Sequence, residues 1–122
     1  MVAYITLGGI LGTLARYLMQ GVIQPRAGMF PGGTLAINIA GSFLLGFIMR
    51  FATGSTVICP ELRGGLTIGF CGAFTTMSTF SYESLRLLGD GEYWYAGVYM
   101  GGTILGCLAA VIAGTALASK LL

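Results

Sequence analysis

The chain contains no histidine and very few charged residues. Only four of its 122 residues are acidic and six are basic, and its three cysteines stand far apart. A nucleophilic serine would lack a base, and a metal would lack ligands. The cysteine spacing gives neither a disulfide framework nor a zinc pattern, and no glycine-rich phosphate-binding motif is present. We therefore expect that the protein is not an enzyme.

Hydrophobic sequence, by contrast, is abundant and comes in long runs. Hydrophobic residues make up 56% of the chain and charged residues 8%, with a mean hydropathy of +0.88. The first run lacks the basic region and the small-residue cleavage site of a signal peptide, so we expect it to be retained. The sequence predicts a single all-α membrane domain, residues 1–122, with four transmembrane helices, each near or above the ~20 residues that cross a bilayer. They are expected at residues 2–23, 32–52, 62–88 and 94–121.

The third run carries the motif GFCGAFTTMSTF at residues 69–80. Its glycines and hydroxyl side chains predict a helix broken in mid-membrane near residues 73–77, between half-helices at 62–72 and 78–88. Backbone groups released at a break cannot face lipid, so they must be buried in protein or line a polar cavity. Free carbonyls suit a small cation, whereas N–H groups and hydroxyls suit an anion. A continuous helix with back-bonded threonines is the alternative.

A polar stripe runs along the second predicted helix. Thr34, Asn38 and Ser42 recur every four residues and so share one face of a helix that is otherwise apolar. The Asn38 amide offers two N–H donors that can replace water around an anion. An ordinary hydrogen bond between helices is the alternative role. In the fourth run Tyr99 and Thr103 lie one turn apart and give a weaker signal of the same kind.

The basic residues are evenly divided between the two sides of the predicted bundle. Topology is normally set by an asymmetry of Lys and Arg near helix ends, and such an asymmetry is absent here. The sequence therefore predicts insertion in both orientations and assembly as an antiparallel dual-topology homodimer, with its two-fold axis in the membrane plane. One side has Arg50, Arg63 and Lys120, and the other has Arg16, Arg26 and Arg86.

Four pairs of glycines at four-residue spacing supply helix faces for close packing. For any single pair, contact within one subunit is favoured over contact between subunits. The pairs are Gly8/Gly12, Gly65/Gly69, Gly97/Gly101 and Gly102/Gly106.

Three motifs together resemble the Fluc (CrcB-like) fluoride channels over essentially the whole chain. They are GGILGTLARY at residues 8–17, GTLAINIAGSF at 33–43 and the 69–80 motif. The resemblance implies passive fluoride efflux across the cell membrane through two narrow pores at the interface of an antiparallel homodimer. It also implies a central sodium ion, held by the backbone carbonyls of Gly72 and Thr75 from both copies.

The same resemblance assigns roles to individual side chains. Asn38 is implied as the pore-facing amide, and Arg16 as a vestibule residue. Further residues implied along the fluoride path are Phe80, Met77, Ser78, Thr79, Thr34, Tyr99 and Thr103. Met77 is a departure, because the family usually has TTFSTF where this chain has TTMSTF. A thioether cannot present the quadrupole of a ring.

Two other functions remain open from the sequence. A small multidrug-resistance-type proton-coupled antiporter also has four helices and dual topology, but it needs a carboxylate in its first helix. No acid lies within residues 2–23, and Glu83 is the only acid inside a span, where we expect it beside a vestibule or an interface. A structural subunit of a larger membrane complex would explain the hydrophobicity but not the broken-helix motif.

Overall fold

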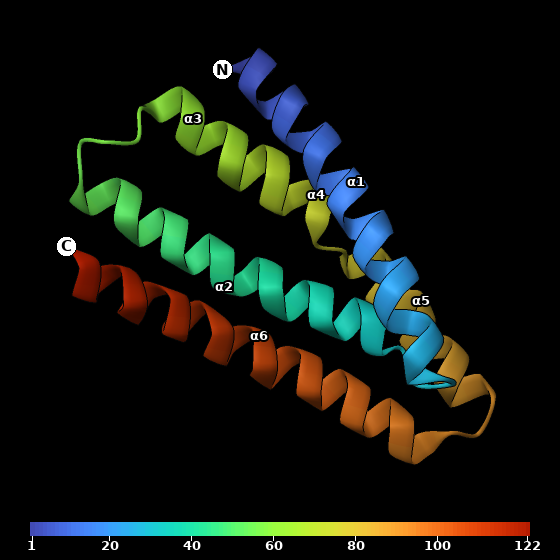
Figure 1. Cartoon of the computed structure of the whole chain (residues 1–122). Helices are drawn as coiled ribbons and strands as arrows, with labels where there is room; N and C mark the ends of the chain where they lie inside the picture. The colour runs from blue at the N-terminus through green and yellow to red at the C-terminus, as the bar shows by residue number, and fades with distance from the viewer.

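Three long helices form the frame of the molecule. The computed structural model describes residues 1–122, and all of its regular structure is helical (Figure 1). The predicted all-α fold is thus confirmed. The long helices are α1 (Val2–Ala27), α2 (Gly32–Gly54) and α6 (Tyr93–Leu121). Each is long and apolar enough to cross a membrane.

The third hydrophobic segment is interrupted, as expected. Its pieces are α3 (Pro60–Gly64), the π-helix η1 (Gly65–Cys71), α4 (Gly72–Phe74) and α5 (Met77–Gly89). Between α4 and α5 the backbone is extended at Thr75 (ψ 158°) and Thr76 (ψ 119°). The interruption therefore covers two residues, which is narrower than the predicted 73–77. A π-helix just before it widens the helical turn, a feature that is frequent at functional sites.

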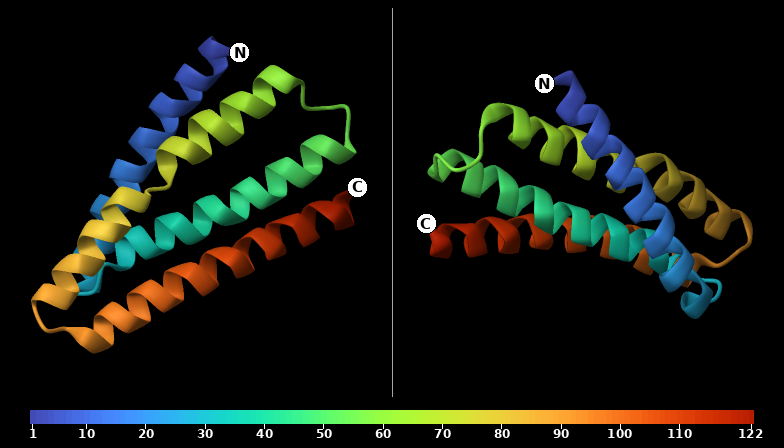
Figure 2. Two further views of the ribbon diagram at one scale, coloured as in Figure 1. Left: turned by 180° about the vertical axis from the view of Figure 1, so that it is seen from behind. Right: turned by 45° about the horizontal axis from the view of Figure 1, so that its top comes forward.

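The chain crosses the bundle lengthwise four times. In Figures 1 and 2, α2 and α6 run antiparallel side by side, while α1 crosses them obliquely beside the interrupted segment. The two chain ends and the α2–α3 connection lie at one end of the molecule. The turn after α1 and the turn after α5 lie at the other end, so the break falls between the two ends.

The first helix is longer than the hydrophobic run predicts. It continues through Pro25 to Ala27 and ends at Gly28, whose φ of 65° is readily adopted only by glycine. The side chain of Gln24 explains why this turn is ordered. Its Nε2 donates to the carbonyls of Gly28 and Phe30, both at 3.1 Å, and its Oε1 accepts from the N–H of Gly33 at 3.0 Å. The polar residues after residue 23 are thus helix and cap rather than loop.

Glycines bring α1 and η1 into backbone contact. A Cβ at Gly8 would collide with the carbonyl of Gly65, and a Cβ at Gly12 would collide with the carbonyl of Phe70. From the other side, a Cβ at Gly69 would meet the α1 backbone. Two of the predicted glycine pairs therefore pack against each other within one subunit. We call this contact the glycine seam, defined by Gly8, Gly12, Gly65 and Gly69.

The α2–α6 contact uses glycines that the four-residue spacing did not single out. A Cβ at Gly46 would collide with the carbonyl of Val111, and a Cβ at Gly114 would collide with the carbonyl of Phe43. The Thr115 hydroxyl adds a hydrogen bond to the Gly46 carbonyl at 3.3 Å. These contacts hold α2 against α6. The polar stripe of α2 faces the interrupted segment.

Candidate functional site

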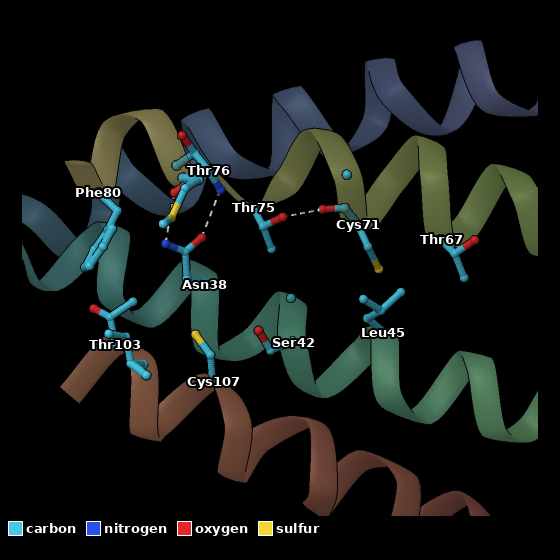
Figure 3. Close-up of a pocket in the computed structure, with 14 residues that line it drawn as sticks. Asn38, Ser42, Leu45, Thr67, Cys71, Thr75, Thr76, Phe80, Thr103 and Cys107 are labelled. Carbon is cyan, nitrogen blue, oxygen red and sulfur yellow. Dashed lines mark hydrogen bonds between the residues drawn. The ribbon is translucent and has the colours of Figure 1, made fainter. Parts of the chain in front are cut away.

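Asn38 and Thr76 meet at the break in the third segment. The Nδ2 of Asn38 donates to the carbonyl of Thr76 at 3.1 Å, and the Oδ1 of Asn38 accepts from the N–H of Thr76 at 2.9 Å (Figure 3). One side-chain amide therefore bonds both polar groups of one peptide residue. Asn38 is only 7% exposed, and a buried amide without partners would cost a few kcal/mol. The interhelical hydrogen bond that the sequence left as an alternative is present.

Thr76 also starts the second half of the segment. Its hydroxyl accepts from the N–H of Thr79 at 3.2 Å and donates to the Thr79 hydroxyl at 3.0 Å, so it is the N-cap of α5. The Ser78 hydroxyl lies 3.4 Å from the hydroxyl oxygen of Thr76. The candidate set from the sequence omitted Thr76, although a threonine just before a helix start is a known N-cap signal.

On the other side of the break, Thr75 folds back on the preceding turn. Its N–H and its hydroxyl both donate to the carbonyl of Cys71, at 3.0 and 2.8 Å. Gly41 of α2 lies directly beneath, where a Cβ would collide with the Thr75 methyl group. The absence of a side chain at residue 41 thus lets α2 approach the break closely.

A groove of about 360 Å³ opens beside the break, between α2, α6 and the interrupted segment (Figure 3). No charged residue lines it. Six of the residues selected from the sequence border it: Asn38, Gly72, Thr75, Met77, Phe80 and Thr103. Further polar or sulfur-bearing lining residues that the candidate set missed are Ser42, Thr67, Cys71, Thr76 and Cys107.

A second hollow of about 320 Å³ lies on the α1 side of the break. Three more candidate residues border it, namely Arg16, Thr34 and Thr79. Thr76 borders both hollows. The two-residue break therefore separates a neutral groove from a hollow that contains one basic side chain.

Two candidate residues border neither hollow. Ser78 is exposed on the outer surface of α5. Tyr99 is fully buried, with its ring centroid 5.3 Å from that of Phe80 and 5.8 Å from that of Phe30. Within a single subunit, Tyr99 thus acts as packing behind Phe80.

Glu83 is the buried partner of the polar stripe. Its Oε1 accepts from the hydroxyl of Thr34 at 2.6 Å, and the hydroxyl of Tyr99 donates to the same oxygen at 3.4 Å. Glu83 is 8% exposed and also borders a hollow that contains Arg86 and Asp90. The sequence expectation of a vestibule or an interface did not include Thr34 and Tyr99 as partners, because they are distant in the sequence.

Met77 lies at the edge of the groove and is 73% exposed. Phe80, one turn later, is 8% exposed. The departure from the TTFSTF pattern therefore falls on an open surface of the subunit and not in its core.

These features define a class of protein. A multi-span helical membrane protein with a broken helix beside a groove is built for moving small solutes, because irregular backbone at membrane depth is tolerated only where it is buried or lines a cavity. A profile of the family described as "CrcB-like protein, Camphor Resistance (CrcB)" matches residues 3–115. The chain belongs to this family.

Similar proteins carry a more specific name. A protein of Geobacter metallireducens named "Fluoride-specific ion channel FluC" is 54% identical over 106 residues, which cover 86% of each chain. Proteins with the same name from Geotalea daltonii and Geobacter sulfurreducens are 51% and 48% identical. These matches cover 88% and 93% of this chain, and 87% and 92% of the respective relatives.

Proposed function

We propose that this protein is a fluoride-specific ion channel that mediates passive fluoride efflux across the cell membrane. The observation that carries the proposal is the uncharged groove at the helix break, with the Asn38 amide and the Ser42 hydroxyl among its lining residues. An anion in this groove can be met by the second N–H of Asn38 and by the O–H of Ser42 without meeting a carboxylate. The lining threonine hydroxyls already donate within the subunit. The names of the relatives agree with this chemistry.

Fluoride is small and strongly hydrated, so each water that leaves must be replaced by a protein donor. Asn38 uses one N–H of its amide on Thr76 and has a second N–H left. The edge of the Phe80 ring carries partial positive charge and can face an anion. Several weak sites in series suit conduction, because an ion must leave each site as readily as it enters. The membrane potential adds about 2.3 kcal/mol per 100 mV to the driving force on one charge.

We propose that a second copy of the chain covers the groove of the first. We place the partner in the opposite orientation, because the basic residues are evenly divided between the two sides. The carbonyls of Gly72 and Thr75 are hard oxygen donors of the kind that binds sodium. One subunit offers only these two, so four carbonyls meet only in a dimer with the breaks facing each other.

The proton-coupled antiporter receives no support. Such a carrier needs an acid that is free to bind a proton and a substrate in turn. The buried carboxylate of Glu83 is bonded to Thr34 and contacts Tyr99, and no acid lies in α1. The three named relatives are all called channels.

Fluoride flux from liposomes that contain the purified protein tests the function. A potassium gradient with an ionophore sets the membrane potential, and a fluoride electrode follows release. We expect potential-driven fluoride release without a proton gradient, and little chloride release under the same conditions. Release that requires an opposing proton gradient, or equal release of both anions, would overturn the proposal.

The variant Asn38→Asp tests the site within the same assay. A carboxylate beside the anion path costs several kcal/mol through like-charge repulsion, so we expect fluoride flux to fall by about 100-fold or more. Thr115→Ala is a suitable control, because it also removes one interhelical hydrogen bond, at a place outside the groove. Undiminished flux in Asn38→Asp would contradict the assigned role of Asn38.

A further inference from the structure

The hydrogen bonds of Asn38 change which backbone carbonyls are free at the break. In an uninterrupted α-helix, the N–H of Thr76 would donate to the carbonyl of Gly72, four residues earlier. Here that N–H donates to the Oδ1 of Asn38 at 2.9 Å instead. The Gly72 carbonyl therefore lacks its helical donor, at a residue that is exposed and borders the groove.

The neighbouring carbonyls have other partners. The carbonyl of Cys71 accepts from the N–H and the hydroxyl of Thr75. The carbonyl of Thr76 accepts from the Nδ2 of Asn38 at 3.1 Å. Gly72 and Thr75 lie between these occupied positions. The hydrogen bonds thus leave without its helical donor the carbonyl of Gly72, which the sequence analysis gave only as implied by a resemblance.

The orientation of the Asn38 amide is fixed by its partners. If it were turned over, its NH₂ group would face the Thr76 N–H and its oxygen would face the Thr76 carbonyl, which are two repulsive contacts. Asn38 is 7% exposed, so water cannot easily replace either bond. One side chain therefore holds the break open from the α2 side.

We propose that Asn38 is a positioning residue for a sodium site at the break, in addition to any contact it makes with the anion. This inference rests on the cation site of the proposed function. By accepting the Thr76 N–H, Asn38 keeps the Gly72 carbonyl free to bind a hard cation. Without Asn38, the Thr76 N–H is free to bond to that carbonyl and extend α4 by one residue.

The test is the sodium dependence of thermal unfolding of the purified protein. Sodium replaces N-methylglucamine at constant ionic strength, and the midpoint is the sodium concentration that half-occupies the site, obtained by fitting the stabilisation to RT ln(1 + [Na⁺]/Kd). We expect Asn38→Ala to raise this midpoint by about tenfold, because a competing hydrogen bond now holds the Gly72 carbonyl. Asn38→Asp retains an acceptor for the Thr76 N–H and adds a negative charge near the cation, so its midpoint should not rise above that of the wild type.

Thr115→Ala is the control for a purely structural effect. It removes a hydrogen bond between α2 and α6 and should lower Tm equally at all sodium concentrations, with an unchanged midpoint. If Asn38→Ala behaves like this control, the positioning role is wrong. If Asn38→Ala does not yield folded protein, Asn38→Ser is measured by the same criterion, because serine is too short to bond both groups of Thr76.

Fluoride flux of the wild-type protein separates this inference from the proposed function. Wild-type protein that conducts fluoride but shows no sodium-dependent rise in Tm would leave the channel intact and overturn the sodium site. Protein that responds to sodium but carries no fluoride would overturn the channel and leave the positioning role standing. An Asn38→Asp variant whose sodium midpoint is not raised and that carries no flux would show that the two roles of Asn38 are separate.

Discussion

The two halves of the interrupted segment are held in place by different means. Before the break, η1 lies against α1 through the glycine seam, where backbone touches backbone and no side chain intervenes. After the break, α5 is held by polar side chains, with Asn38 bonded to Thr76 and Thr34 bonded to Glu83. The first half is fixed by close backbone contact. The second is fixed by these hydrogen bonds together with Phe80 and Leu87, which belong to a buried cluster with Ala96 and Tyr99 of α6, and hydroxyl groups border the hollows around its start.

This difference shows how one segment serves two purposes. Close backbone contact at the glycine seam fixes the distance between the two helices. Hydrogen bonds fix direction, and they satisfy backbone groups that the break has released. The glycine seam therefore supports the break from the α1 side, while the hydrogen bonds to α2 orient the break toward the groove.

The substitution Gly12→Val disrupts the glycine seam, which holds the first half of the interrupted segment. Its Cβ would collide with the carbonyl of Phe70, and a backbone atom cannot move aside as a flexible side chain can. We expect a destabilisation of roughly 3 kcal/mol or more, with loss of the folded protein. The measurements are the elution profile in detergent and thermal unfolding. Gly9→Val is the matched control, because no atom lies within 4 Å of its added Cβ, and an equal loss in both variants would contradict the seam.

The substitution Glu83→Ala removes hydrogen bonds that hold α5, the second half of the interrupted segment. It leaves the hydroxyls of Thr34 and Tyr99, both buried, without their shared acceptor. We expect a loss of about 2 kcal/mol in the free energy of unfolding. Glu83→Gln keeps a carbonyl oxygen as acceptor and should lose about 1 kcal/mol. Chemical unfolding of both variants checks the order, and an alanine variant as stable as the wild type would show that the cluster contributes nothing.

Much of the fold follows from hydropathy and spacing, because long apolar runs leave a membrane chain few choices other than helices. The four-residue spacing also placed Asn38 on the correct face of α2. Its partner was out of reach, since Thr76 lies 38 residues away and pairing over that distance depends on how whole helices pack. The same limit applies to the glycine pairs. Their spacing predicted close contact but not which pair meets which, and Gly97 and Gly101 have no atom within 4 Å of an added Cβ.

Glu83 shows the other limit of sequence reasoning. Its place near the end of a span predicted a vestibule or an interface, without indicating its partners. The structure buries it because Thr34 and Tyr99 both converge on it from other helices. An acid with two hydroxyl donors is stable in a position where an isolated acid would be costly. No local signal in the sequence reports such donors.

The substitution Thr76→Ala sharpens the comparison, because it removes a side chain at the break but keeps the backbone bonds to Asn38. The N-cap of α5 is lost, which costs about 1 kcal/mol. Thr76→Ser keeps the hydroxyl and should lie close to the wild type. Hydrogen exchange checks the mechanism, since the amide of Thr79 should become less protected only in the alanine variant. Unchanged protection at Thr79 would mean that the cap is not formed.

The smallest effect on stability is expected for Met77→Phe, at the outer edge of the polar half. Met77 is 73% exposed in the subunit, so its replacement should change the free energy of unfolding by less than about 0.5 kcal/mol. Its effect on transport should be larger, because a ring places a partially positive edge at the groove where the thioether has none. We expect fluoride flux to rise by about threefold, from a gain below 1 kcal/mol. Met77→Leu is the control without a ring and should conduct like the wild type. If the leucine variant gains as much as phenylalanine, the gain comes from shape, and residue 77 makes no electrostatic contact with the anion.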